Sequence, residues 1–570
     1  MKRRVEGLLR RALEEAKTKG ALGSETLPPP VVEIPKDASF GDLATPVALS
    51  LARSERKPPR QIAESLRAEV LRIDGGQWIA SAEVAGPGFL NFRLTNRFWA
   101  ECLGEVERGL VPRGVEKERI LVEFVSGNPT GPLHVGHGRG AVTGDVLSRL
   151  LEASGYEVSR EYYVNDAGNQ IDALGRSAFV RLLELYGGER PFPEDGYPGE
   201  YLRELVVAEA ENLFVAIAER TGAEVPVDPE GRRRFLETHE SVAVDVCGRE
   251  ASRVLLDRIR EDLALCEIRF DRFVSERALR ESGAVGRVVE ELRAKGLAYE
   301  SDGALWFRST AFGDEKDRVL VRQSGELTYF ACDIAYHLDK LARGYEKLVN
   351  VWGADHHGYL ARLRAALRAF GHDPERLQVV FVQIVNLTRG GRPVRMGKRS
   401  GEFVSLREVL DEVGVDATRF FFLMRKSDSQ LEFDLELAKQ QSTENPVYYV
   451  QYVHARCASL FRQAEALGVP VPAFEEVDFE RFSTAEEGEL VRGLAAFGDV
   501  VEEAAGEREP HRVVFYLVDL AGRFHRFYNR HRVLGEDRDL ARARLYLCKV
   551  TREVVARGLG LLGVRAPDRM

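Results

Sequence analysis

The most constraining feature of the sequence is a short apolar run that leads through a glycine-rich loop into a helical stretch. Residues 120–125 are mostly apolar, as in a strand buried on both faces of a parallel sheet. Residues 126–140 are rich in Gly, Pro and His, and residues 141–154 have the apolar spacing of a helix. A strand, a loop and a helix in this order form the opening unit of a doubly wound nucleotide-binding sheet. We therefore predict an α/β fold with a Rossmann-like parallel sheet.

The rest of the chain divides into regions of different character. Residues 1–110 are predicted to form a small α+β domain, and residues 115–392 the parallel-sheet domain. The charged, amphipathic stretch 176–260 is expected to be a helical insertion in that domain. Helical periodicity then predicts an all-α bundle over 441–570, joined by a connecting region at 393–440. Further strands of the α/β domain are expected at 158–164, 304–307, 319–322, 348–351 and 379–385.

Composition excludes several classes of protein. The 570 residues are 44% hydrophobic and 30% charged, which are globular values. The 6 cysteines include no C-x-x-C pair, so a disulfide scaffold and a thiolate zinc site are both disfavoured. Charge interrupts every apolar stretch before 18 residues, and the N-terminal helix lacks the apolar core of a signal peptide. We expect a cytoplasmic protein that does not enter a membrane.

Charge is distributed unevenly along the chain. The whole chain carries a net charge of −9, whereas residues 511–570 contain 13 Lys and Arg against 6 Asp and Glu. Such a local reversal, with aromatic residues interleaved among the basic ones, is typical of a surface that binds unpaired RNA. The alternative is the ordinary charged outer face of a helix. The residues expected to contact RNA are Arg523, Phe524, Arg526, Phe527, Tyr528 and Arg530.

Two histidines stand where the predicted loop meets the predicted helix. The first N–H groups of a helix and its positive dipole end suit a phosphate chain. His134 and His137 can donate hydrogen bonds to phosphate oxygens, and Gly136 between them lets a flat purine approach the backbone. The pattern therefore indicates a nucleoside triphosphate site. Zinc binding by the two histidines is the competing chemistry, but Cys or carboxylate partners at ligand spacing are missing. Burial of both rings in the core is the third alternative.

This motif resembles the signature of a known class of enzymes. The tetrapeptide H-V-G-H at 134–137 is similar to the H-I-G-H signature of class I aminoacyl-tRNA synthetases. About 260 residues later, residues 395–401 resemble the K-M-S-K-S loop of that class. The second lysine of the loop is present as Lys398. The loop departs from the family pattern at Arg395, Gly397 and Arg399.

The resemblance implies a reaction with ATP. His134, His137 and Lys398 would be the catalytic residues, because they would hold the triphosphate while charge develops on it. Mg²⁺ would accompany ATP by bridging phosphate oxygens, with no dedicated metal site on the protein. The residues implied to contact ATP are Gly131, Pro132, Leu133, His134, Gly136, His137, Gly138, Met396 and Lys398.

Further stretches resemble the bacterial arginyl-tRNA synthetase family in particular. The N-terminal residues 35–45 resemble that family's additional tRNA-contacting domain, and the C-terminal helices resemble its anticodon-binding domain, so the resemblance covers nearly the whole chain. It implies L-arginine and tRNA(Arg) as partners, tRNA bound before arginine is activated, and 393–440 as a signature-loop and stem-contact region. We expect a monomer. The stretches that carry the resemblance are 124–141, 162–170, 329–337, 351–359, 399–406, 416–419 and 444–452.

Arginine as substrate agrees with the chemistry of one short stretch. A guanidinium favours a bidentate carboxylate partner and an aromatic face. Tyr329 and Asp333 are four residues apart, so on a helix they share one face. The alternative is that Tyr329 belongs to the core and Asp333 caps a helix. The resemblance implies that Tyr329 and Asp333 hold the guanidinium, because the family uses a Tyr and an Asp at this spacing. By resemblance, the remaining arginine-binding residues are Asn128, which would hold the α-amino group, His134, His356 and Glu123.

Two rival functions differ in class from this one. A class I synthetase for another amino acid, such as cysteine, is disfavoured by the missing zinc-type cysteine spacing. A non-catalytic, synthetase-like RNA-binding protein would commonly have lost signature residues, whereas both histidines and Lys398 are present.

Overall fold

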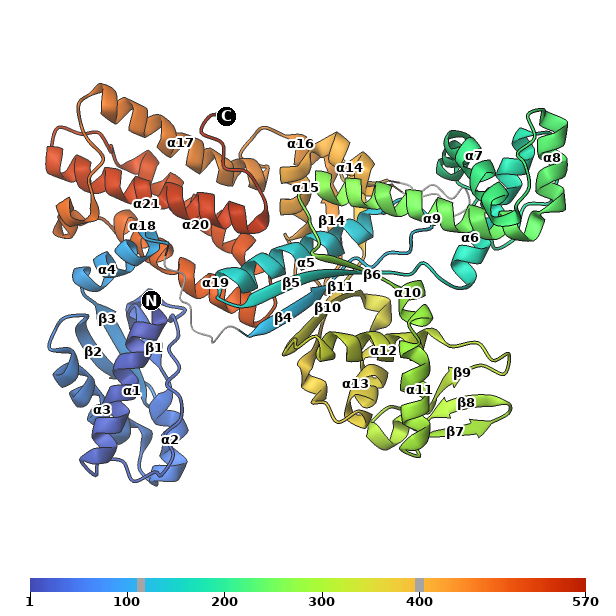
Figure 1. The fold of residues 1–570 in the computed structure, drawn as a ribbon. Coiled ribbons are helices and arrows are strands. Elements are labelled where there is room, and N and C mark those ends of the chain that lie inside the picture. The colour runs from blue at the N-terminus through green and yellow to red at the C-terminus, as the bar shows by residue number, and fades with distance from the viewer. Residues whose placement is uncertain (110–117, 395–403) are drawn as a thin grey trace.

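The computed structural model describes residues 1–109, 118–394 and 404–570, and a parallel sheet lies at its centre (Figure 1). The strands follow the order β11-β10-β4-β5-β6, and each neighbouring pair is parallel. The predicted Rossmann-like sheet is therefore confirmed. Strand order reverses between β4 and β10, and open α/β sheets bind ligands at the carboxyl ends of strands at such a point. The strands span Leu377–Val382 (β11), Lys347–Gly353 (β10), Arg119–Glu123 (β4), Glu157–Val164 (β5) and Arg272–Ser275 (β6).

Helix α5 (Val135–Ala153) follows β4 and packs against the sheet. Gly144 on this helix lies against the ring of Phe124, and a Cβ at Gly144 would come within 2.2 Å of that ring. Glycine alone permits so close an approach of helix to strand. The glycine therefore allows the middle of α5 to pack closely against Phe124, directly after β4.

The predicted helical insertion forms a lobe of its own, drawn in green at the upper right of Figure 1. Its helices bury a separate apolar cluster. Helices α6 and α9 cross at Gly175 and Gly248, where a Cβ on Gly175 would come within 2.4 Å of the Val244 carbonyl oxygen. Together the four helices extend beyond both ends of the predicted stretch 176–260. They span Asn169–Leu185 (α6), Glu200–Thr221 (α7), Pro229–Thr238 (α8) and Glu240–Leu265 (α9).

Two expected strands of the α/β domain belong instead to a separate antiparallel sheet. Strands β8 and β9 form at the positions expected for 304–307 and 319–322, but among the described residues β8 pairs with β7 and β9 only. The expected run 379–385 is split between β11 and β12. The sequence pattern does not predict β6, because four residues are too few to show a period. These strands span Ala298–Ser301 (β7), Ala304–Phe307 (β8), Arg318–Val321 (β9), Val385–Arg389 (β12), Arg392–Pro393 (β13) and Leu431–Asp434 (β14).

Helices flank these smaller sheets. Helix α12 begins at Thr328, whose hydroxyl accepts the N–H of Ala331 as an N-cap. Helix α14 begins with a capping box between Ser405 and Glu408. The helices span Glu276–Glu281 (α10), Ala284–Ala294 (α11), Tyr329–Ala342 (α12), Tyr359–Ala369 (α13), Leu406–Val413 (α14), Val415–Phe422 (α15) and Leu435–Lys439 (α16).

The N-terminal region is the predicted small α+β domain, drawn in blue in Figure 1. Its antiparallel sheet has the order β1-β3-β2 and packs against helices α2 and α3. Its elements span Lys2–Thr18 (α1), Leu43–Thr45 (β1), Val47–Glu55 (α2), Pro59–Asp74 (α3), Ile79–Ala85 (β2), Phe89–Leu94 (β3) and Asn96–Glu107 (α4).

The C-terminal region is the predicted all-α bundle. Its long helices bury apolar residues against one another, and the N-terminal α1 and α4 lie beside it (Figure 1). Within the part of the chain that the structure describes, no helix is both long and apolar enough to cross a bilayer. The bundle helices span Pro446–Ala466 (α17), Ala485–Ala495 (α18), Phe497–Gly506 (α19), His511–Arg530 (α20) and Arg538–Leu562 (α21).

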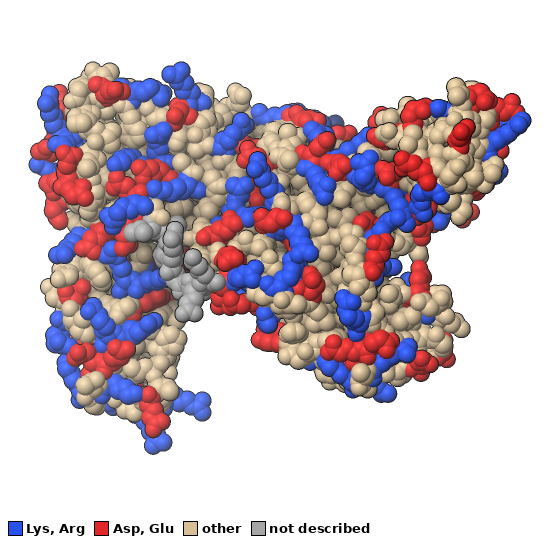
Figure 2. Space-filling view, viewed as in Figure 1, with Lys and Arg blue, Asp and Glu red and all other residues tan. Residues whose placement is uncertain are grey.

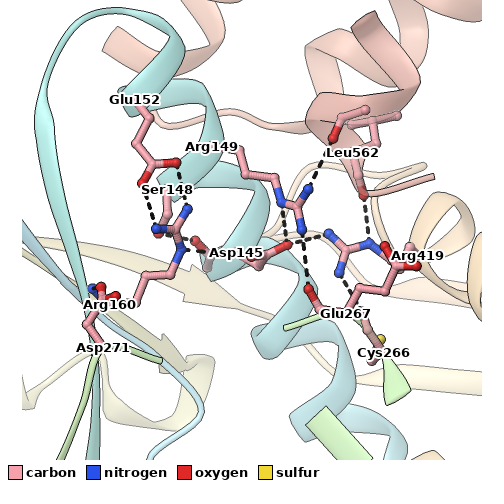
Figure 3. A network of polar contacts seen from close by, with 12 residues as sticks. Asp145, Ser148, Arg149, Glu152, Arg160, Cys266, Glu267, Asp271, Arg419 and Leu562 are labelled. Atoms are coloured by element: carbon pink, nitrogen blue, oxygen red, sulfur yellow. Dashed lines mark hydrogen bonds and ion pairs between the residues drawn. The ribbon is translucent and has the colours of Figure 1, made fainter. Parts of the chain in front are cut away.

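A buried polar junction fastens this bundle to helix α5 (Figure 3). Arg419 on α15 is fully buried and forms an ion pair with Asp145 of α5. Its other donors bond to the carbonyl oxygens of Leu562, at 2.7 Å, and Cys266, at 2.8 Å. Arg149 donates to the same carboxylate at 2.9 Å. Through Arg419 and Arg149, the Asp145 carboxylate therefore links α5 to the end of the insertion and to the last bundle helix.

Candidate active site

A cavity of about 780 Å³ opens at the carboxyl ends of the parallel strands. The segments that follow β4, β5, β10 and β11 form its walls, and helix α12 closes one side. The reversal of strand order predicts a ligand at this place. Residues predicted from distant parts of the sequence meet in this cavity: Glu123, Asn128, His134, Gly136, His137, Tyr329, Asp333 and His356.

The two signature histidines form the first turn of α5. Nδ1 of His134 accepts the N–H groups of Gly136, at 3.1 Å, and His137, at 3.3 Å, so the proton of the neutral ring belongs on Nε2. The two rings stack with centroids 3.7 Å apart. Burial lowers the pKa of His134, and lowers that of His137 to about 3 with a contribution from His134. Both imidazoles are therefore neutral at pH 7 and offer N–H groups without positive charge.

The segment that follows the expected signature loop is bonded directly to the start of α5. The N–H of Val135 donates to the carbonyl oxygen of Val404 at 3.2 Å, and the N–H of Leu406 donates to that of Leu133 at 2.7 Å. The chain therefore returns from the loop beside the two histidines. The loop residues Arg395, Met396, Gly397, Lys398 and Arg399 lie outside the described residues.

Four members of the predicted ATP set lie outside the cavity wall: Gly131, Pro132, Leu133 and Gly138. Leu133 is 1% exposed and belongs to the core. A Cβ on Gly138 would come within 2.6 Å of the Leu406 side chain, so this glycine serves the packing of α5 on α14. Gly131 faces the Tyr201 hydroxyl. Leu133 and Gly138 both serve packing, and their contact with ATP stays a prediction.

The other end of the cavity carries an aromatic side chain and a carboxylate. Tyr329 is 41% exposed, so it is not a core residue, and Asp333 lies one turn further along α12. The hydroxyl of Tyr359 donates a hydrogen bond to Asp333. Burial raises the pKa of Asp333 to about 7, although the bond from Tyr359 opposes the rise. The arrangement suits a planar cation, because an aromatic face and a carboxylate meet on one side of the cavity.

Three family models match the chain in sequence order. "Arginyl tRNA synthetase N terminal domain" matches residues 3–94, "tRNA synthetases class I (R), catalytic domain" matches 106–432, and "DALR anticodon binding domain" matches 450–570. The curated arginine–tRNA ligase of Syntrophotalea carbinolica is 50% identical over 579 residues, which cover 100% of both chains. The chain belongs to the arginyl-tRNA synthetase family.

Other arginyl-tRNA synthetases agree with this assignment. The arginine–tRNA ligase of a Geobacter species is 46% identical over 578 residues, again covering 100% of both chains. The solved arginyl-tRNA synthetase of Thermus thermophilus superimposes with a TM-score of 0.77 at 26% identity, covering 100% of each chain. The class I catalytic fold, with its N-terminal domain and helical C-terminal domain, is therefore shared along the full length.

Polar neighbours hold the asparagine that the arginyl-tRNA synthetase resemblance assigns to the substrate amine. Asn128 donates to Gln170 at 2.5 Å and accepts a hydrogen bond from Asn165 at 3.0 Å. Asn165 directly follows β5, and Gln170 lies in the first turn of α6. Both residues belong to the stretch 162–170, which resembles the family. That resemblance, together with polar residues after a predicted strand, was the signal that could have identified them.

Glu123 and His356 both line the cavity, but they differ in burial. Glu123 is buried and forms an ion pair with Lys340 at 2.5 Å, and one of its oxygens accepts the Ser126 hydroxyl at 2.9 Å. His356 is exposed at the cavity mouth, 3.5 Å from Asp355. Glu123 is thus held inside the wall, whereas the imidazole of His356 faces solvent.

One carboxylate of the cavity was not predicted from the sequence. Glu276 of α10 is 1% exposed, lines the cavity and pairs with Arg280 on its own helix. It follows the short edge strand β6, whose pattern is too brief to predict. Tyr359 was likewise unassigned, although it ends the family-like stretch 351–359.

The predicted RNA-contacting residues on α20 divide into buried and exposed ones. Phe524 and Phe527 are fully buried in the bundle core, so the prediction that they stack on bases is wrong. Helical spacing explains the error. Aromatic residues that alternate with basic ones occur both on the apolar face of an amphipathic helix and in an RNA-binding surface, so the sequence does not distinguish the two. The basic residues on this helix are paired: half-buried Arg523 with Asp519, and exposed Arg526 with Glu489 and Arg530 with Glu486.

The surface of the C-terminal bundle shows the same mixing of charge. On the face drawn in Figure 2, Lys and Arg are interspersed with Asp and Glu over the C-terminal bundle at the upper left. Tyr528 is half-buried, and the Arg456 guanidinium lies over its ring at 4.4 Å. A net charge counted along the sequence therefore overstates the basic character of this face.

Proposed function

We propose that the chain joins L-arginine to the 3′ end of tRNA(Arg) at the expense of ATP. Arginine and ATP would form arginyl-adenylate and pyrophosphate, and the arginyl group would then pass to the terminal adenosine, releasing AMP. One observation carries the proposal. A single cavity joins a helix N-terminus with two stacked imidazoles to an aromatic and carboxylate pair suited to a guanidinium.

The proposed activation step needs no nucleophile from the protein. An oxygen of the arginine carboxylate attacks the α-phosphorus of ATP. The bond between the α-phosphorus and the oxygen that bridges it to the β-phosphorus breaks, and pyrophosphate leaves with that oxygen. Catalysis is then positioning together with stabilisation of the charge that develops. Neutral His134 and His137 would donate N–H groups to phosphate oxygens, and Lys398 would supply the positive charge that they lack. Lys398 lies six residues from Val404, which is bonded to α5.

We propose that Mg²⁺ enters with ATP. Among the described residues, no group of three or more His, Cys, Asp or Glu side chains is arranged to hold a metal ion. Glu123 and Glu276 in the cavity wall already have cationic partners. The ion would therefore be held by phosphate oxygens, whose charge it would neutralise when bound.

Exchange of pyrophosphate into ATP tests the proposed function. The purified chain is incubated with ATP, labelled pyrophosphate and each of the twenty amino acids in turn, with and without tRNA(Arg). Label should enter ATP with arginine and tRNA(Arg) together. Exchange with another amino acid would show a different synthetase, and no exchange under any condition would favour a non-catalytic RNA-binding protein.

Lys398→Ala should lower the rate of arginyl-adenylate formation by roughly 10²–10³-fold, the size typical of losing one preorganised donor to developing charge. The KM for arginine should stay close to that of the parent, because the lysine is expected at the phosphates. Pyrophosphate exchange at saturating substrates measures the rate. Lys426→Ala, at an exposed lysine, is the matched control. Normal turnover of the Lys398 variant would refute the assignment of the loop.

The KM for arginine should rise as the pH falls below neutrality. Asp333 binds a guanidinium only as a carboxylate, and burial raises its pKa to about 7, so protonation removes the charge as the pH falls through that value. Between pH 8 and pH 6 the ionised fraction falls about tenfold, and KM should rise by about the same factor. Steady-state exchange at a series of pH values measures it, with the KM for ATP as the internal control. A flat arginine KM over this range would contradict the role of Asp333.

We propose that tRNA(Arg) contacts both the N-terminal domain and the C-terminal bundle, where the arginyl-tRNA synthetase N-terminal and anticodon-binding models match. Arg523, Arg526, Arg530 and Tyr528 remain proposed contacts, since their side chains reach the surface. Binding would require the basic residues to exchange their carboxylate partners for phosphates. We also propose a monomer that acts in the cytoplasm. The six cysteines are buried free thiols, which accords with a reducing compartment.

A further inference from the structure

Lys340 is the one lysine among the largest fully buried side chains of the described residues. Its ammonium group lies 2.5 Å from the carboxylate of Glu123, 3.4 Å from the amide oxygen of Asn350 and 4.1 Å from the ring centre of Tyr336. A buried charge of this kind is costly unless it is paired. Lys340 does not line the cavity, but Glu123, Tyr336 and Asn350 do. Three groups that it touches therefore face the substrate site.

The first of these contacts leads to the loop that presents Asn128. Val125 and Ser126 have φ angles of +64° and +42°, in the left-handed region that side chains other than glycine rarely adopt. The Ser126 hydroxyl donates to Glu123 at 2.9 Å and accepts the N–H of Tyr163 at 3.1 Å. These bonds hold the strained turn in place. Because Lys340 fixes the Glu123 carboxylate, it also fixes the group on which the turn relies.

The second contact leads to the turn of α12 that carries the guanidinium site. Asn350 is within hydrogen-bond distance of Nε2 of His337, at 3.0 Å, and Nδ1 of His337 lies 2.8 Å from the carbonyl oxygen of Asp333. Burial and the neighbouring Lys340 lower the pKa of His337 to about 3, so the ring is neutral. A neutral ring has one N–H donor and one acceptor nitrogen, so it can bond to Asp333 on one side and to Asn350 on the other. Lys340 thus connects strand β10 with the backbone of Asp333.

We propose that Lys340 is a positioning residue for arginine recognition, which aligns the loop of Asn128 with the turn of Asp333 and keeps both ends of the site complementary to the substrate. The inference rests on the proposed function of the cavity. Lys340 itself does not contact arginine. It acts through Glu123 on one side and through Asn350 and His337 on the other.

The charges around Asp333 make this role measurable. Besides burial, Glu123 on β4 and Glu276 on α10 raise the pKa of Asp333, whereas the Tyr359 hydroxyl on α13 and Lys340 on α12 lower it. Glu276 is paired with Arg280 on its own helix. Removing the positive charge of Lys340 should therefore move the pH at which arginine binding is lost upward, and removing the negative charge of Glu123 should move it downward.

Three variants test the inference by the pH profile of the arginine KM. Lys340→Met keeps the length of the side chain and removes the charge, so it should raise the arginine KM at least tenfold at pH 7, leave the ATP KM within twofold and move the midpoint of the pH profile upward. Glu123→Gln should move the midpoint downward. Combining both substitutions should return it toward that of the parent. Lys295→Met, at a partly exposed lysine that follows α11, is the matched control.

If Lys340→Met fails to fold, the midpoint of the pH profile can still be compared between Glu123→Gln and the double variant. A lysine that served packing alone would lower thermal stability without moving any midpoint, so identical midpoints in Glu123→Gln and the double variant would overturn the inference. Lys340→Met that folds and keeps the arginine KM and midpoint of the parent would overturn it too. A parent protein without arginine-dependent exchange would instead refute the proposed function, and the inference with it.

Discussion

Replacing Asp333 by Asn is expected to lower kcat/KM for arginine by roughly 10²–10³-fold or more. The amide keeps the shape of the side chain but removes the negative charge, so a guanidinium desolvated in the cavity would lose its ionic partner. Removing one partner of a buried ion pair costs about 3–5 kcal/mol, and each 1.36 kcal/mol is a factor of ten. The effect should fall mainly on the KM for arginine, because the proposed contact forms when the substrate binds.

The measurement is tRNA-dependent pyrophosphate exchange as a function of arginine concentration, with ATP saturating. Asp339→Asn is the matched control, since Asp339 is a carboxylate of the same helix that pairs with Arg343. It should leave the arginine KM within about twofold of the parent, because Asp339 does not line the cavity and Arg343 keeps its ion pair with Glu161. The ATP KM should be unchanged in both variants. An Asp333→Asn variant that keeps the arginine KM of the parent would remove Asp333 from the guanidinium site.

Arg419→Met is expected to destabilise the protein by about 3–5 kcal/mol, because it leaves the Asp145 carboxylate buried without its main partner. The carbonyl oxygens of Leu562 and Cys266 would lose their donors at the same time. Arg149 can compensate only in part, since its other donors already bond to the carbonyl oxygens of Gly560, at 3.2 Å, and Glu267, at 3.2 Å. The junction in Figure 3 would open between α5 and the end of α21.

Urea unfolding followed by circular dichroism measures this loss. Arg425→Met, at an exposed arginine close by in sequence, should cost less than about 0.5 kcal/mol. Adding Asp145→Asn to Arg419→Met should recover part of the stability, because the unpaired buried charge is then gone. A loss below about 1 kcal/mol in the single variant would show that the junction does not hold the bundle to α5.

Local patterns predicted the parts of the site that lie within one short stretch of chain. The apolar run 120–125, the glycine-rich loop and the helix with His134 and His137 are each visible over a few residues, because period and turn chemistry are local properties. Spacing on one helix gives Tyr329 and Asp333 a common face, and the family resemblance assigned that pair to the guanidinium. The structure brings both pairs into one cavity.

Local patterns failed where burial depends on what packs against an element. Phe524 and Phe527 stand among basic residues in sequence, yet they face the bundle core, and the residues around them determine this. Gly138 belongs to the signature motif, but its missing Cβ makes room for Leu406. The strands at 304–307 and 319–322 have the right local pattern, whereas their pairing into a separate sheet is a long-range choice.

The sequence by itself determined the order of the domains, the parallel α/β core and the chemical types at the two ends of the site, because these depend on composition, periodicity and short motifs. Only the tertiary structure decided which charges neutralise one another. Asp145 with Arg419 and Glu123 with Lys340 are separated by hundreds of residues along the chain. Their pairing follows from desolvation, because burying an unpaired charge is costly and an opposite charge nearby in space reduces that cost. The partner can come from any distance along the sequence.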